Sequence, residues 1–509
     1  MAPLFASWLA DHGAAFAIAL PLLAAAITAL LPKVRRLPWA VALLVSAIVT
    51  IAAYAVLQTQ VDLGSFIYRM GGWEPPHGIS LKIDAVNAPI LLLIAAMGLM
   101  TLVYSAPSVE AEVQTKKRAP FYAAFLLCMA GLCGMVVTGD AFNVFVFLEV
   151  SSISTYTLVA MGANRDRRAL SAAFNYLILG SIGATFFVIG VGFLYAETGT
   201  LNMDDMQRIL ANLDGGSRVA QVAFGFIVVG LGLKLAMFPL HTWLPGAYAY
   251  SPTMVTVFLS STATKAALYL MYRFSFNVFD PSFDYVAVVL TYIVTALAVT
   301  GMIFCSLQAF FQTDIRRTLA FSSVAQVGYM LLGIGLISMS GLAGSYLHLI
   351  NHAVVKGGLF LALGAMWYRF GIVRLDDMAG LAKTMPITTA AFTILAFSLI
   401  GVPFTAGFVS KVALAEAAAE QGWWWAVGVI MITSIIALFY MGRMMMMAYF
   451  RDPPMVDGVA VKRNEAPPLM LIPMVGLALL SIMIGARGHV LLTEISENAA
   501  RVLIPGGGL

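Results

Sequence analysis

The chain has 509 residues, of which 61% are hydrophobic and 11% are charged, and its mean hydropathy is +0.90. This composition is typical of a polytopic membrane protein and excludes a soluble globular enzyme. The formal net charge of +4 is small and spread over several loops, which argues against nucleic acid as a partner. The three cysteines all lie in apolar runs without a CxxC pair, so they predict neither disulfides nor zinc or iron–sulfur ligands.

Motifs for cofactor binding are missing from the sequence: it contains no GxGxxG, no Walker A and no haem-attachment pattern. We therefore expect no cofactor, no metal and no electron transfer in this chain, so that any redox activity would belong to partner subunits. The first basic residue is Lys33, which leaves the first apolar run without the n-region of a signal peptide. That run is expected to remain as a transmembrane span.

Apolar runs long enough to cross a bilayer follow one another along the whole chain and predict an all-α membrane protein with about fourteen transmembrane helices. The chain is expected to end soon after the last span, without an appended domain or a long lateral helix. The predicted spans are 14–32, 38–58, 85–106, 119–138, 141–162, 169–196, 218–240, 252–274, 284–308, 318–338, 342–368, 386–418, 422–449 and 466–487.

Basic residues are distributed unevenly between the loops on the two sides of the membrane. Eighteen lie in the odd-numbered loops or at the helix ends beside them, whereas seven lie in or beside the even-numbered loops and in the C-terminal tail. By the positive-inside rule the odd loops, including Lys116–Arg118, are cytoplasmic. The sequence therefore predicts a multi-pass membrane protein with both termini outside.

Four of the 29 basic residues can be placed neither in a loop nor at a helix end, and all four are lysines: Lys234, Lys265, Lys356 and Lys411. A lysine at the bilayer centre costs roughly 2.5–3.5 kcal/mol on insertion scales. Arginine stays charged at any reachable pH, whereas a lysine in an apolar environment can release its proton. A set that contains only lysines therefore predicts proton handling.

Two of these lysines lie beside helix-breaking residues. Lys234 precedes Pro239 by five residues, and Lys411 follows Pro403 by eight. Proline lacks an N–H and leaves a carbonyl without its helical partner, so broken backbone lies beside a titratable group, as in ion pathways. The alternative for Lys234 is a side chain that snorkels to one interface.

The recurrence of this lysine–proline pairing five spans apart predicts an internal repeat. Because five is odd, the second unit would have the opposite orientation in the membrane, giving two inverted five-helix repeats with broken helices 7 and 12. The expected units are an N-terminal segment (1–118), the two repeats (119–274 and 284–449) and a C-terminal loop with helix 14 (450–509).

Further polar residues lie in the predicted spans. Glu149 is mid-span among aromatic residues and is either a helix-packing glutamate or the partner of a lysine. Lys265 follows the hydroxyl-rich run Ser260–Thr264. His348, His352 and Lys356 are spaced four apart, which places them on one helix face. The two histidines resemble half of a zinc site, but without HExxH or further ligands a proton relay is the better interpretation.

Several of these stretches resemble one family, the antiporter-like subunits of respiratory complex I and of Mrp-type multisubunit sodium/proton antiporters. The resemblance covers approximately residues 70–450, and Gly71–Ile79 looks most like the Mrp D-type subunit. The stretches that carry it are Lys234–Pro245 (K-x-x-x-x-P-x-H-x-W-L-P), Asp314–Ser323, His348–Lys356 and Gly401–Lys411.

The resemblance implies fourteen helices in two inverted repeats, a pair formed by Glu149 and Lys234, and a hydrophilic axis continued by Lys265, the His348/His352/Lys356 group and Lys411. Three departures matter. Gln326 stands where several relatives carry histidine, Gly246 replaces an acid after the WLP element, and the last axis residue is lysine where one complex I subunit type has glutamate. The last departure favours the D-type subunit.

Two functions follow from these observations. The first is a proton-translocating subunit of a multisubunit Na⁺(K⁺)/H⁺ antiporter, with other membrane subunits as partners and protons and Na⁺ or K⁺ as ions. The second is a proton-pumping subunit of complex I or of a membrane-bound hydrogenase-type complex. A stand-alone transporter of an organic solute is disfavoured, because no separate polar cluster for a substrate is visible.

Overall fold

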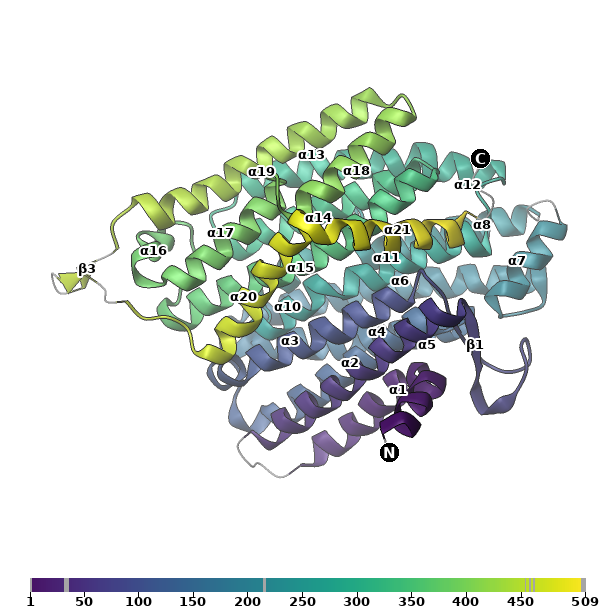
Figure 1. The fold of residues 1–509 in the computed structure, drawn as a ribbon, viewed down its shortest axis with the longest axis horizontal. Helices are drawn as coiled ribbons and strands as arrows, with labels where there is room; N and C mark the ends of the chain where they lie inside the picture. The colour runs from purple at the N-terminus through teal and green to yellow at the C-terminus, as the bar shows by residue number, and fades with distance from the viewer. Residues whose placement is uncertain are drawn as a thin grey trace.

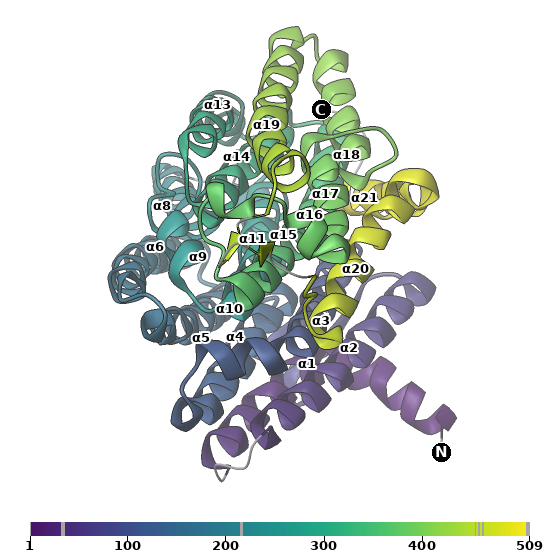
Figure 2. The same cartoon turned by 90° about the vertical axis from the view of Figure 1, so that its left-hand side faces the viewer.

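The computed structural model describes residues 2–31, 36–213, 217–453, 455–456, 459–460 and 463–504. Long helices that lie side by side make up most of it (Figure 1). Seen from one end, the N-terminal helices occupy one edge of the bundle and the helices near residues 300 and 430 the opposite edge (Figure 2). Lys33, Arg35 and Lys462, which contribute to the predicted charge asymmetry, and Leu509 lie outside the described residues.

The helices and strands have the following bounds. The longer helices are α1 (Ala2–Leu30), α2 (Leu37–Leu63), α3 (Ala88–Glu112), α4 (Arg118–Val137), α5 (Ala141–Ala160), α6 (Arg168–Thr198), α8 (Arg218–Leu235), α13 (Thr295–Phe311), α14 (Ile315–Gly335), α15 (Met339–Phe370), α19 (Trp424–Phe450) and α20 (Pro468–Met483). The shorter ones are α7 (Met203–Asn212), α9 (Trp243–Tyr250), α10 (Thr253–Ser261), α11 (Ala263–Tyr272), α12 (Asp284–Val288), α16 (Leu381–Thr384), α17 (Pro386–Ile400), α18 (Ala406–Glu420) and α21 (His489–Leu503). Single-turn 3-10 segments are η1 (Met70–Gly72), η2 (Thr115–Lys117), η3 (Met161–Asn164) and η6 (Asp376–Met378), and π segments are η4 (Arg273–Val278), η5 (Val289–Val294) and η7 (Ile484–Gly488). The strands are β1 (Phe66–Arg69), β2 (Ser80–Ile83), β3 (Met455–Val456) and β4 (Val459–Ala460), which form two antiparallel hairpins.

The predicted membrane architecture is confirmed. Within the described residues, thirteen helical segments are long and apolar enough to cross a bilayer. The remaining predicted span, 386–418, is occupied by the shorter helices α17 and α18, which together cover the same stretch. The centre of the bundle is formed by α14 and α15, whose apolar windows are entirely buried.

Both predicted helix breaks are present. Helix α8 ends at Leu235, where Ala236 adopts a left-handed conformation, and α17 ends at Ile400, where Gly401 does the same. A third break, which the sequence does not predict, separates α10 from α11 at Thr262. Each break exposes carbonyl oxygens that an unbroken helix would use internally.

The C-terminal region differs from the prediction. Helix α20 passes through the π segment η7 into α21, which continues toward the other end of the bundle (Figure 1). The sequence predicts no long helix after residue 487, because the polar residues of α21 lower its hydropathy below that of a membrane span. Its buried residues, Ser496, Ala499, Ala500 and Leu503, follow the helical period instead.

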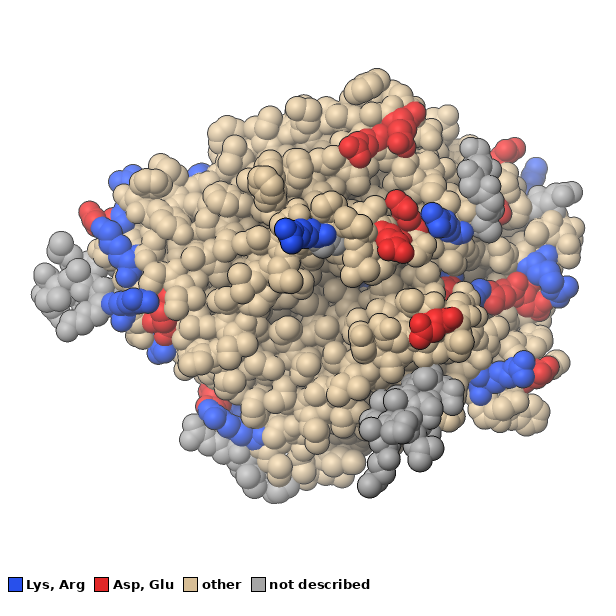
Figure 3. All heavy atoms as spheres, in the orientation of Figure 1, with Lys and Arg blue, Asp and Glu red and all other residues tan. Residues whose placement is uncertain are grey.

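On the face that Figure 3 shows, most charged side chains lie toward the two ends of the bundle, and only a few lie between them. Two arginines at helix ends are nevertheless buried: Arg273 is 3% exposed and Arg316 is 4% exposed. Arg273 forms an ion pair of 2.8 Å with Asp84, and Arg316 donates to the Thr253 hydroxyl at 2.9 Å. Buried cations are therefore not exclusively lysines, and the lysine argument applies to positions within the membrane-spanning bundle.

Candidate functional site

Glu149 and Lys234 face each other from α5 and the last turn of α8. The Lys234 Nζ lies 4.0 Å from the Glu149 Oε1 and donates a hydrogen bond of 2.6 Å to the Ser152 hydroxyl. Glu149 Oε1 is buried and has no hydrogen-bond partner among the described residues. The carboxylate and ammonium are thus close enough to offset each other's burial, while the ammonium is held by a neutral hydroxyl.

The break after α8 is held in place by the WLP element of the sequence, in which Trp243 begins α9. The indole Nε1 donates to the Leu233 carbonyl at 2.9 Å, and the Met237 N–H donates to the Gly232 carbonyl at 2.8 Å. These bonds satisfy carbonyls that the interrupted helix leaves without partners. They fix the last turn of α8 and therefore the position of Lys234.

Lys265 lies at the unpredicted break between α10 and α11. Its Nζ donates to the Ser260 carbonyl at 2.5 Å and to the Thr264 hydroxyl at 3.2 Å. The hydroxyl groups of Ser261 and Thr262 bond to carbonyls of the preceding turn. Such side-chain bonds compete with the backbone hydrogen bonds of the helix, which explains how the helix breaks here without proline or glycine.

On α15, His348 makes two side-chain hydrogen bonds, whereas His352 makes none within the part of the chain that the structure describes. The Nδ1 of His348 lies 2.9 Å from the Ser410 hydroxyl, and its Nε2 lies 2.9 Å from the Gln326 amide oxygen. The two imidazole rings stack with centroids 6.2 Å apart. Both ring nitrogens of His352 are buried and unbonded among these residues, so this side chain can accept a bond from a water or a proton carrier.

Lys356, one turn further along α15, contacts α14. Its Nζ donates to the Leu319 carbonyl at 3.0 Å and to the Ser322 hydroxyl. The ammonium is fully buried, and α15 lies against the α10–α11 break at this level: a Cβ atom at Gly357 would lie 3.5 Å from the Cβ of Ser261, beside the break that carries Lys265. Lys265, His352 and Lys356 therefore form the middle of the polar region.

Lys411 lies in the first turns of α18, opposite the break that precedes this helix. Its Nζ donates to the carbonyls of Leu399 and Ile400 at 3.0 and 2.9 Å and to the Ser434 hydroxyl at 3.0 Å. The same ammonium lies 5.1 Å from the centroid of the Tyr329 ring, which stacks on His348. The predicted broken backbone and its lysine thus meet directly.

The seven predicted residues form two groups. His348 connects to Lys411 through Ser410 and Tyr329, and the middle residues lie beside them. Glu149 and Lys234 contact each other but, among the described residues, no hydrogen bond links them to Lys265. No group of three or more metal-ligating side chains occurs in the described part of the chain.

The comparison with known proteins decides the family. Residues 138–437, more than half of the chain, match the model of the family described as "NADH:quinone oxidoreductase/Mrp antiporter, TM". The chain belongs to this family. NADH-quinone oxidoreductase subunit N of Desulforudis audaxviator (strain MP104C) is 39% identical over 468 residues, covering 90% of this chain and 92% of the relative. The D-type subunit of the Na(+)/H(+) antiporter of Alkalihalophilus pseudofirmus is 30% identical, with 87% of each chain covered.

Solved structures agree with this assignment to the NADH:quinone oxidoreductase/Mrp antiporter family. A chain of the Mrp complex from Dietzia sp. DQ12-45-1b superposes with a TM-score of 0.88 at 27% identity, covering 98% of both chains. A chain of the membrane-bound sulfane sulfur reductase, an archaeal respiratory membrane complex, has a TM-score of 0.87 at 30% identity, covering 96% of this chain and 97% of its own. The predicted family and fold are therefore confirmed.

The sequence did not identify most of the neutral groups that hydrogen-bond the four buried lysines. Each ammonium bonds at least one hydroxyl, from Ser152, Thr264, Ser322 or Ser434. Ser152 lies about one helical turn after Glu149, so helical spacing from a candidate residue is a usable signal. Ser322 and Ser434 lie on other helices, and no local pattern connects them to their lysines.

The break beside Lys411 is covered by a glycine of η7. A Cβ atom at Gly485 would lie 2.4 Å from the backbone of Phe404 and Thr405, so even alanine must displace this segment. We expect Gly485→Ala to lower ion flux about tenfold, because the displaced segment connects the carbonyls of Leu399 and Ile400 to the helix that carries Lys411. Gly476→Ala is the matched control, since no atom lies within 4 Å of the Cβ position there. Equal flux in both variants, measured on assembled protein, would refute this role of Gly485.

Proposed function

We propose that this chain is a proton-translocating subunit of a multisubunit Na⁺(K⁺)/H⁺ antiporter. Protons would move along the axis of Glu149, Lys234, Lys265, the His348/His352/Lys356 group and Lys411. Other membrane subunits would be its partners, as the multisubunit complexes among its structural relatives indicate. The chain would lie in a bacterial plasma membrane.

One observation carries this proposal most strongly. Among the described residues, Lys265, Lys356 and Lys411 contact hydroxyls and carbonyls and form no ion pair with a carboxylate. A buried charge without a counter-charge is costly, and the buried Arg273, which stays charged, is paired with Asp84. Neutral partners suit a side chain that alternates between ammonium and amine. A hydroxyl accepts a hydrogen bond from the ammonium and donates one to the amine.

The alternative function is proton pumping within a redox complex of the complex I or hydrogenase type. The 39% identity to a relative named as subunit N of an NADH-quinone oxidoreductase specifically favours it. Affinity purification of the tagged chain with identification of its partner subunits separates the two. Small antiporter subunits would support the antiporter, and iron–sulfur and quinone-site subunits would support the redox complex.

Transport itself is tested in proteoliposomes that contain the purified complex and an internal pH-sensitive dye. An inward Na⁺ or K⁺ gradient is expected to drive outward proton movement, and dissipation of that gradient with an ionophore should stop it. A complex that shows no cation-driven pH change would contradict the antiporter proposal.

We further propose that both termini lie outside the cytoplasm and that the units 119–274 and 284–449 act as inverted repeats. The excess of basic residues in the odd-numbered loops supports this orientation. A reporter that is active only outside the cytoplasm is expected to be active after Leu509 and inactive at Lys117. The reverse pattern would overturn the topology.

A further inference from the structure

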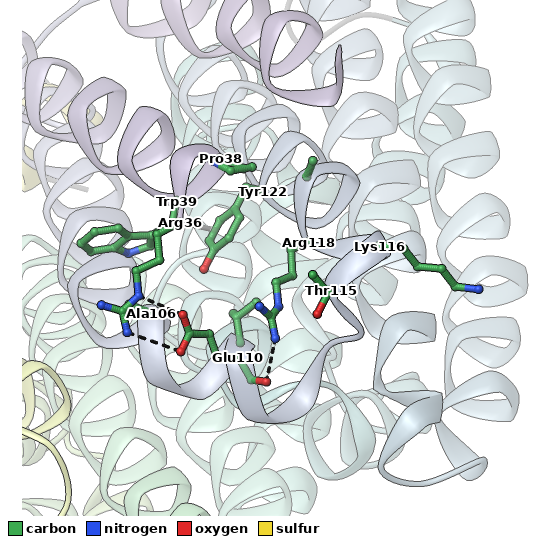
Figure 4. A pocket seen from close by; sticks show the side chains of 11 residues that line it. Arg36, Pro38, Trp39, Ala106, Glu110, Thr115, Lys116, Arg118 and Tyr122 are labelled. Atoms are coloured by element: carbon green, nitrogen blue, oxygen red, sulfur yellow. Dashed lines mark hydrogen bonds and ion pairs between the residues drawn. The ribbon is translucent and has the colours of Figure 1, made fainter. Parts of the chain in front are cut away.

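A small pocket outside the lysine axis lies where α2, α3 and α4 meet at the end of the bundle that carries the first and third loops. Figure 4 shows it: the guanidiniums of Arg36 and Arg118 lie on either side of the Glu110 segment, with the Tyr122 hydroxyl between them. Arg36 forms an ion pair of 2.8 Å with the Glu110 carboxylate, and Arg118 donates to the Glu110 carbonyl at 2.9 Å. Residues far apart in the sequence thus build one basic site.

The charge of the pocket is positive after this pairing is taken into account. Its lining contains three cations, Arg36, Lys116 and Arg118, and one carboxylate, that of Glu110. Lys116 extends outward from the pocket rather than into it (Figure 4). Among the described residues, the hydrogen bonds of Arg118 go to backbone carbonyls, which do not neutralise its charge. An anion that enters the pocket therefore meets one excess positive charge from Arg36, Arg118 and Glu110, and Lys116 adds a second one outside the pocket.

Apart from Thr115, the rest of the lining is apolar or aromatic, as at a membrane interface. Pro38, Trp39, Ala106 and Val109 form the wall, and the Trp39 indole is anchored by a bond of 2.8 Å to the Leu102 carbonyl. Tryptophan and tyrosine beside basic residues are typical of the headgroup level of a bilayer. Deeper on α2, Leu44 and Ile51 are 62% and 56% exposed and lie seven residues apart on one helix face.

The size of the pocket limits its ligand. Its volume of about 40 Å³ holds roughly three water-sized groups. This space suits the free oxygens of one phosphate. The exposed face of α2 offers an apolar surface to a chain attached to that phosphate, which a free inorganic anion would not use.

From this geometry we infer that the pocket binds the phosphate of an anionic phospholipid in the leaflet that faces the basic loops. Arg36 and Arg118 hold the phosphate, Trp39 and Tyr122 lie at the level of the glycerol backbone, and an acyl chain follows Leu44 and Ile51. Basic pockets between transmembrane helices on the cytoplasmic side are a known physical solution for binding such headgroups. The site is independent of the proton axis.

The test uses the purified complex that contains the full chain, stripped of lipid and titrated with phosphatidylglycerol or phosphatidylcholine, with bound lipid counted by native mass spectrometry. Phosphatidylglycerol is expected to bind in preference to phosphatidylcholine. Arg36→Gln and Arg118→Gln should each weaken it about fivefold, the effect of one basic residue near an anionic surface. Lys117→Gln is the matched control, because this exposed lysine lies in the same turn and does not line the pocket.

A second variant keeps the test valid if loss of an arginine impairs assembly. Glu110→Gln removes the competing carboxylate and frees Arg36, so phosphatidylglycerol should bind more tightly. Three results would overturn the inference: equal binding of the two lipids, equal effects of Lys117→Gln and Arg118→Gln, or displacement of phosphatidylglycerol by equimolar inorganic phosphate. The last would assign the pocket to a free anion.

Discussion

Lys234→Ala is expected to reduce proton-coupled flux roughly a hundredfold, the lower end of what a proton-transferring side chain contributes. The substitution removes the ammonium that bonds Ser152 and lies 4.0 Å from Glu149. Glu149 then loses the charge that offsets its burial, and the proposed switchable pair no longer exists. Flux is measured in proteoliposomes by dye response and normalised to the amount of assembled complex.

Lys383→Ala is the control for this variant. Lys383 pairs with Asp452 at 2.8 Å, but both side chains are well exposed, so its removal should leave flux and assembly close to wild type. A Lys234→Ala complex that assembles normally and transports as well as Lys383→Ala would show that the Glu149–Lys234 pair has no role in transport.

Lys411→Arg is expected to fail almost as completely as Lys411→Ala. A relay lysine must exist in both protonation states during turnover, whereas arginine keeps its charge at any working pH. The contacts of Lys411 suit such alternation, since two backbone carbonyls and one hydroxyl accept from its ammonium and, among the described residues, no carboxylate fixes the charge. Loss of about a hundredfold in flux is expected for both variants.

The arginine variant also has to fit, because the Lys411 ammonium lies between the carbonyls of Leu399 and Ile400 and the Ser434 hydroxyl. Assembly yield and thermal stability are therefore measured together with flux. If Lys411→Arg retains most of the wild-type flux, Lys411 acts as a fixed electrostatic gate, and the relay has to end at another residue.

Much of the fold is readable from the sequence because each span is a long apolar run between polar loops. The predicted span 38–58 corresponds to Leu37–Leu63, and 141–162 to Ala141–Asn164. Breaks marked by proline and glycine, such as Gly401 with Pro403, are also visible. The break at Thr262 is not, because its cause is a set of serine and threonine side-chain bonds in an apolar context.

The candidate site is only partly readable for a similar reason. Mid-span lysines and histidines stand out because they are costly in a membrane, and the structure places His348 and Lys411 around the same tyrosine. Contacts between distant segments leave no local pattern. Asp84 and Arg273 are separated by 189 positions, and nothing in the sequence connects the two members of this buried pair.

Proton flux through complexes with a single Lys→Arg substitution at each of positions 234, 265, 356 and 411 tests the central claim most directly. Lys383→Arg serves as the exposed control, and every value is normalised to assembled complex. If protons pass along a lysine relay, all four buried substitutions lose nearly all flux while the control transports normally. If the four arginine variants transport as well as the control, the lysines are fixed charges and the proposed proton axis is wrong.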